Sequence, residues 1–62
     1  MDIASESRVI QEFVDKGNYH AAMNIAISAL NDRRRNNDQF GVDVFLGVIK
    51  GISDTIITEF GS

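Results

Sequence analysis

The sequence contains no cysteine, no proline and no tryptophan, and it has a single histidine. Without cysteine, neither a disulfide nor a thiolate zinc site can stabilise the fold, and one histidine cannot make a histidine-rich metal site. A chain of only 62 residues has marginal stability unless a disulfide, a structural metal or oligomerisation supports it. Of these three supports, oligomerisation is the one that the composition leaves open.

The sequence also lacks a long uncharged apolar run. Its most hydrophobic stretch, residues 40–60, carries four charged side chains: Asp43, Lys50, Asp54 and Glu59. Charges at these positions argue against a transmembrane span, and the N-terminus has no basic region followed by an apolar run, as a signal peptide would. The net charge of −3 and the pI near 4.7 disfavour nonspecific binding to nucleic acid or anionic lipid. We therefore expect a cytoplasmic protein with no membrane and no nucleic-acid partner.

Capping residues and glycine indicate a tight pair of helices in the first half of the chain. Asp2 can cap a first helix, and Gly17 can end it because glycine readily takes the left-handed conformation. Asn18 follows at once as a candidate N-cap for a second helix from Tyr19 to about Arg34. Helices joined so closely must fold back as an antiparallel hairpin.

A third, longer helix is expected after Asp38, another candidate N-cap, and it ends at Phe60 before a glycine. Gly41 lies one turn inside and could delay the regular start to Val42 or the next residue. The β-branched residues within 52–58 make a C-terminal strand the main alternative. The sequence predicts an all-α, three-helix fold: a tight helical hairpin plus a long C-terminal helix, in a single domain over residues 1–62 that is completed by oligomerisation.

The third predicted helix is apolar on two sides. One stripe has the spacing of a core-facing surface: Val42, Phe45, Leu46, Ile49, Ile52, Ile56 and Phe60. A second strip lies on roughly the opposite side: Phe40, Val44, Gly47, Val48, Gly51 and Thr55. A helix that is apolar all round is normally buried all round, and the rest of the chain is too small to cover both sides. We therefore predict a self-association or partner interface that comprises Phe40, Val44, Gly47, Val48, Gly51, Ile52 and Thr55.

Gly47 and Gly51 stand four residues apart in the middle of this helix. Each costs about 1 kcal/mol relative to alanine, so the pair needs a reason, and close approach of another helix is a physical one. The approaching helix could belong to another molecule. Alternatively, the face of the second helix with Ala22, Ala26 and Ala29 could pack on the glycines within one chain.

Residues 17–30 resemble the second helix of a tetratricopeptide repeat. They begin with a glycine-asparagine-tyrosine turn, and Ala22 and Ala29 provide small residues seven apart, followed by Leu30. The match covers about a quarter of the chain. The resemblance implies helical-hairpin packing and a module that binds peptides or proteins.

Few residues suggest chemistry. His20 is the one group that titrates near neutral pH when unperturbed, and no nucleophile or second acid-base group accompanies it at a recognisable spacing. The carboxylates are dispersed without a metal-binding pattern, so we predict no enzymatic activity, no cofactor and no metal. Arg33, Arg34 and Arg35 end the second helix, where cations offset the helix dipole. The alternative is that these arginines bind phosphate.

The sequence therefore predicts a small, acidic, self-associating helical protein, a homodimer or a higher homo-oligomer. It would bind a protein partner and modulate that macromolecule as a regulator, adaptor or inhibitor. In size and charge it resembles the small accessory proteins of bacteria and their phages. The alternative function is an oligomeric anion-binding protein that uses Arg33, Arg34 and Arg35 for nucleotide or nucleic-acid phosphate.

Overall fold

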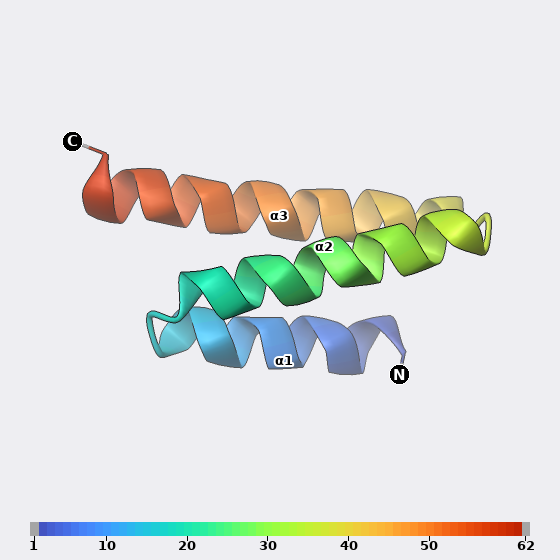
Figure 1. Ribbon diagram of the computed structural model, residues 1–62, viewed down its shortest axis with the longest axis horizontal. Coiled ribbons are helices and arrows are strands. Elements are labelled where there is room, and N and C mark those ends of the chain that lie inside the picture. Colours follow the sequence, from blue (N-terminus) through green and yellow to red (C-terminus); the bar gives the residue numbers. More distant parts are fainter. Residues whose placement is uncertain (1, 62) are drawn as a thin grey trace.

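The computed structural model describes residues 2–61, and these form three α-helices without a β-strand (Figure 1). The helices are α1 (Ile3–Asp15), α2 (Tyr19–Arg35) and α3 (Gln39–Phe60). The predicted all-α, three-helix arrangement is confirmed. The alternative of a C-terminal strand is wrong, because residues 52–58 lie within α3 and pack as a helix against the rest of the chain.

Each helix begins at the side-chain cap that the sequence predicts. The backbone amide three residues later donates to the capping side chain, at 2.7 Å for Asp2, 3.3 Å for Asn18 and 3.0 Å for Asp38. The amide of Ser5 lowers the pKa of Asp2 by stabilising its carboxylate. This cap therefore contributes fully above the unfolded pKa of the carboxyl, and its contribution is lost as pH falls through the lower folded pKa. Gly41 does not delay α3, because its amide is the donor to Asp38.

The two turns share one backbone structure. Gly17 and Asn37 are left-handed, with φ of 77° and 56°. In both turns the left-handed residue donates to the carbonyl three residues back, and the next amide donates to the carbonyl five back, at 2.8 to 3.1 Å. This is the Schellman pattern that ends many helices. The following residue, Asn18 or Asp38, already caps the next helix, so each helix reverses into an antiparallel neighbour.

In the view of Figure 1, α2 crosses between α1 and α3. Both α1 and α3 pack extensively on α2, whereas α1 and α3 contact each other at few positions. The molecule measures 37 by 19 by 14 Å along its principal axes. The side of α1 and α3 away from α2 is therefore left without a covering helix.

The core between the helices is small. Its buried members are Ile10, Ala22, Ala26, Ala29, Phe45 and Ile52. Half of them are alanines of α2, whose small side chains allow the neighbouring helices to come close. Phe45 and Ile10 are the largest fully buried side chains. Because so few large side chains are buried, the folded chain buries little apolar surface and gains little stability from it.

The predicted core stripe of α3 is right at its centre and wrong at its margins. Phe45 and Ile52 are buried, and Ile49 is half-buried beside them. Leu46, by contrast, is 51% exposed and Phe60 is 71% exposed. The stripe is wider than the surface that α1 and α2 cover. Leu46 lies outside that covered surface. Phe60 lies at the end of the helix. Its ring packs edge-on against the tyrosine ring at the start of α2, with the two ring centroids 6.0 Å apart.

Candidate protein-interaction site

A groove of about 320 Å³ separates α1 from α3. Four residues of α1 and four of α3 line it: Ser7, Ile10, Gln11, Val14, Val48, Gly51, Ile52 and Thr55. All eight are uncharged. Ile10 and Ile52 are almost completely buried and so lie at the bottom, while Gln11 and Gly51 are exposed at the two walls. Because the lining comes from α1 and α3, the groove opens on the side away from α2.

The groove contains much of the interface that the sequence predicts. Four of the seven predicted residues line it: Val48, Gly51, Ile52 and Thr55. Of the other three, Phe40 is 71% exposed, Gly47 is exposed and Val44 is half-buried. Ile52 is only 3% exposed and belongs to the core of its own chain, so it offers little surface to a partner.

The α1 wall of the groove was not predicted. Ser7, Gln11 and Val14 follow the i, i+4, i+7 spacing of one helix face, so the sequence did carry a signal. Two of these residues are polar, so they do not belong to an apolar periodic pattern. Their position beside α3 follows only from the way both outer helices pack on α2.

Gly47 and Gly51 face open space. A Cβ added at either position would meet no atom within 4 Å, apart from the local helix backbone. The interpretation that α2 packs on these glycines is therefore wrong, because Ala22 and Ala26 are buried in the core elsewhere. The surface at the two glycines is free for close approach by another molecule.

A second exposed apolar area lies on the other flank of α3. Leu46 is 51% exposed and Ile57 is 63% exposed. With about 100° between successive helical residues, these two share one side of α3, and Lys50 and Asp54 lie between that side and the groove side. Lys50 Nζ is 2.9 Å from Asp54 Oδ2. A charged strip thus divides the exposed apolar surface of α3 into two parts.

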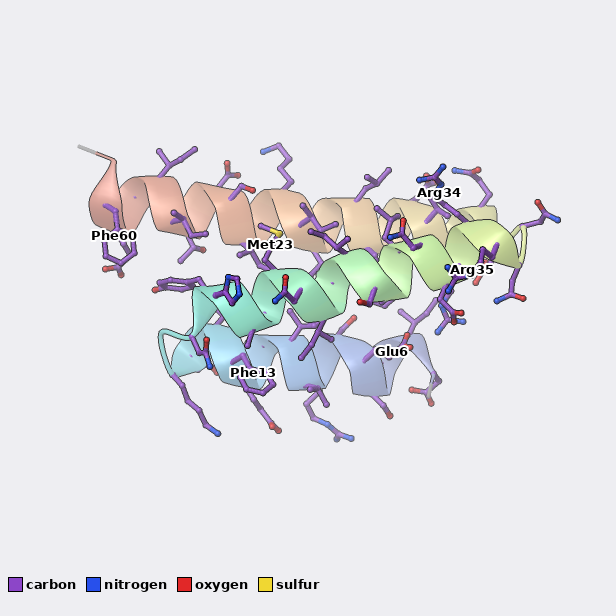
Figure 2. The ribbon with its side chains drawn as sticks, in the orientation of Figure 1. Glu6, Phe13, Met23, Arg34, Arg35 and Phe60 are labelled. Atoms are coloured by element: carbon purple, nitrogen blue, oxygen red, sulfur yellow. The ribbon has the colours of Figure 1, made fainter. Side chains whose placement is uncertain are left out.

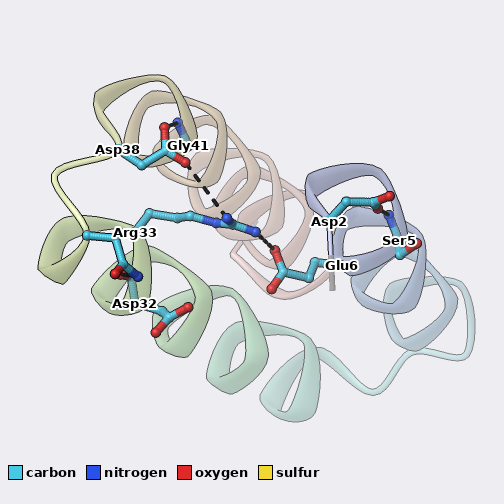
Figure 3. A network of polar contacts seen from close by, with 8 residues as sticks. Asp2, Ser5, Glu6, Asp32, Arg33, Asp38 and Gly41 are labelled. Carbon is cyan, nitrogen blue, oxygen red and sulfur yellow. Dashed lines mark hydrogen bonds and ion pairs between the residues drawn. The ribbon is translucent and has the colours of Figure 1, made fainter.

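Arg33 is part of a structural ion-pair network rather than of an open cationic surface (Figure 3). Its Nη2 lies 2.6 Å from Glu6 Oε2, and its Nη1 lies 3.8 Å from Asp38 Oδ2. The hydrogen bond to Glu6 raises the pKa of Arg33. A Cβ at Gly41 would lie only 2.8 Å from Arg33 Cδ, so glycine at this position leaves room for the arginine side chain. The network joins α1, the end of α2 and the start of α3.

The other two arginines do not join Arg33 at a common site. Successive residues of a helix are about 100° apart, so the three side chains leave α2 in different directions. Figure 2 shows Arg34 and Arg35 at the end of α2, and both line a surface hollow with Asn31. Arg35 Nη2 is 3.5 Å from Asp32 Oδ1, and the side chain is 72% exposed. The geometry therefore provides at most two neighbouring exposed arginines.

Replacing Arg33 with alanine is expected to lower the melting temperature clearly. Glu6, whose side chain is 14% exposed, would lose the partner that offsets its burial, and the tie between α1 and α2 would be lost. Arg35→Ala is the matched control, because an exposed ion pair contributes little. Thermal denaturation followed by circular dichroism compares the two. Equal melting temperatures would contradict a stabilising role for the network.

No protein-family model, curated protein or solved structure matches this chain. Within residues 2–61, no three acidic or histidine side chains gather where they could hold a metal ion. Nor does any helix in this range combine the length and apolar character needed to cross a bilayer. His20 is exposed, and its Nε2 lies 3.2 Å from Asn24 Nδ2.

Proposed function

We propose that this chain is a small, non-enzymatic, cytoplasmic interaction protein that self-associates and modulates another macromolecule as a regulator, adaptor or inhibitor. The observation that supports this most directly is the exposed apolar surface on both flanks of α3. One flank forms the uncharged groove with α1, and the other presents Leu46 and Ile57. Two separate apolar areas allow a second copy and a different macromolecule to bind at the same time.

The small core supports the same proposal. A chain of 62 residues without cysteine has neither a disulfide nor a large apolar interior to stabilise it. Association buries further apolar surface and stabilises the folded state by mass action. The resemblance of residues 17–30 to a tetratricopeptide-repeat helix also favours a protein-binding role.

The alternative of phosphate binding has less support. Arg33 is held by Glu6 and Asp38, and Asp32 lies beside Arg35. Carboxylates this close compete with an incoming anion for the guanidinium groups. The geometry thus favours the protein-interaction role.

The absolute mass in solution tests self-association. Light scattering should give a dimer or a larger species, a multiple of 6.9 kDa, at micromolar concentrations. The mass should be nearly the same at low and high salt, because the groove has no charged lining. A monomer at every concentration, up to the high micromolar range, would contradict self-association.

A further inference from the structure

We propose that a second copy of this chain occupies the groove between α1 and α3, so that two copies pack groove face to groove face about a two-fold axis. The inference rests on the proposed self-association and specifies the surface that self-association uses. It also assigns the opposite flank of α3, with Leu46 and Ile57, a position outside this dimer interface.

The charge distribution favours a second copy over a basic partner. The chain has nine carboxylates and a net charge of −3, yet none of the eight residues lining the groove is charged. A basic peptide would find no carboxylate within the groove to pair with. A second acidic chain, in contrast, needs an interface whose centre is neutral, because buried like charges would repel strongly.

Two polar side chains of the groove already have hydrogen-bond partners within their own helices. The hydroxyl of Thr55 donates to the carbonyl of Gly51 at 2.9 Å, so its donor is already satisfied. The amide of Gln11 donates along α1 to Asp15 Oδ1 at 2.8 Å. Covering these two side chains therefore leaves the Thr55 hydroxyl and one N–H of the Gln11 amide with an acceptor, whereas a buried donor without an acceptor would be costly.

The shape of this face suits two-fold packing. Such an interface is self-complementary: each copy must offer both a recess and a projecting part. The groove provides the recess, and the exposed Phe40 lies on the same flank of α3 as Gly47 and Gly51. No atom outside the local helix backbone lies within 4 Å of where a Cβ would stand on either glycine, so a partner helix can approach the backbone closely there.

The available area is close to what a specific dimer needs. Stable interfaces bury about 800 Å² on each partner. The two longer principal-axis extents, 37 and 19 Å, define a rectangle of roughly 700 Å² that encloses the broad side of the molecule. The area of this side is therefore of the same order as the area that a specific dimer buries. The narrow sides, 14 Å across, offer less.

The test places the same charge on each flank of α3 and on the α1 wall. Gly51→Glu and Gln11→Glu put a carboxylate in the groove, whereas Ile57→Glu is the control on the other flank. None of these positions is buried, and Gly51→Glu improves helix propensity, so the monomer fold should persist. Sedimentation equilibrium measures the dimer dissociation constant, and circular dichroism confirms helicity.

Gly51→Glu and Gln11→Glu are expected to raise the dimer dissociation constant by about 100-fold or more, because each dimer would bury two unpaired charges. Ile57→Glu should change it by less than about threefold, since its charge stays in solvent. If Ile57→Glu dissociates the dimer, or the two groove variants leave it intact, the groove is not the interface, although self-association itself would stand. A wild-type monomer throughout would overturn both this inference and the proposed self-association.

Discussion

Phe45→Ala is expected to unfold the protein at room temperature. Phe45 is completely buried between the helices, and Ile10 is the other large side chain of the core that is almost completely buried. Truncating a buried phenylalanine to alanine costs about 3 to 5 kcal/mol, and the core of a domain this small supplies only about that much. Loss of the helical circular dichroism signal at low micromolar concentration would show the effect.

Phe40→Ala is the matched control for this substitution. It makes the same chemical change on the same helix, but Phe40 is 71% exposed. The unfolding free energy of the monomer should therefore change by less than about 0.5 kcal/mol. A Phe45→Ala variant that still unfolds cooperatively at the same urea concentration as Phe40→Ala would show that the core does not depend on this ring.

Ala26→Leu is expected to destabilise the fold by about 1 to 3 kcal/mol, because no space exists for three more carbons. Ala26 has no exposed surface and lies at the middle of α2, the helix on which α1 and α3 both pack. The larger side chain must push one of these helices outward. Urea denaturation measures the loss of stability.

Asn31→Leu provides the comparison for Ala26→Leu. Asn31 is on the exposed side of the same helix, so a leucine there has room and should leave the midpoint of urea denaturation nearly unchanged. An Ala26→Leu variant as stable as Asn31→Leu would mean that the helices can separate without cost, contrary to the close packing at the alanines.

The parts of this fold that sequence predicts correctly are those that local chemistry determines. Each helix is capped by a short acceptor side chain that accepts a hydrogen bond from the backbone amide three residues later, as Asp2, Asn18 and Asp38 do. This separation of three residues can be read directly from the sequence. Gly17 ends α1 because glycine takes positive φ at little cost. Such signals place the helix boundaries within a residue or two.

The parts that sequence did not predict depend on residues far apart in the chain. Glu6 and Arg33 are 27 positions apart, and their contact follows only from the packing of α1 on α2. Gly41 was interpreted as a possible break in α3, whereas its lack of a side chain makes room for Arg33. For the candidate site, one helix wall was predicted from the apolar pattern of α3. The wall on α1 required the position of both helices on α2.

The central position of α2 has a consequence for the way the chain folds. Nearly all contacts between helices join neighbours in sequence, α1 with α2 and α2 with α3, across turns that reverse the chain within a few residues. Proteins dominated by such short-range contacts fold in microseconds to milliseconds, because little chain entropy is lost before contacts form. Since α2 belongs to both hairpins, either hairpin can form first and serve as the surface on which the remaining helix docks.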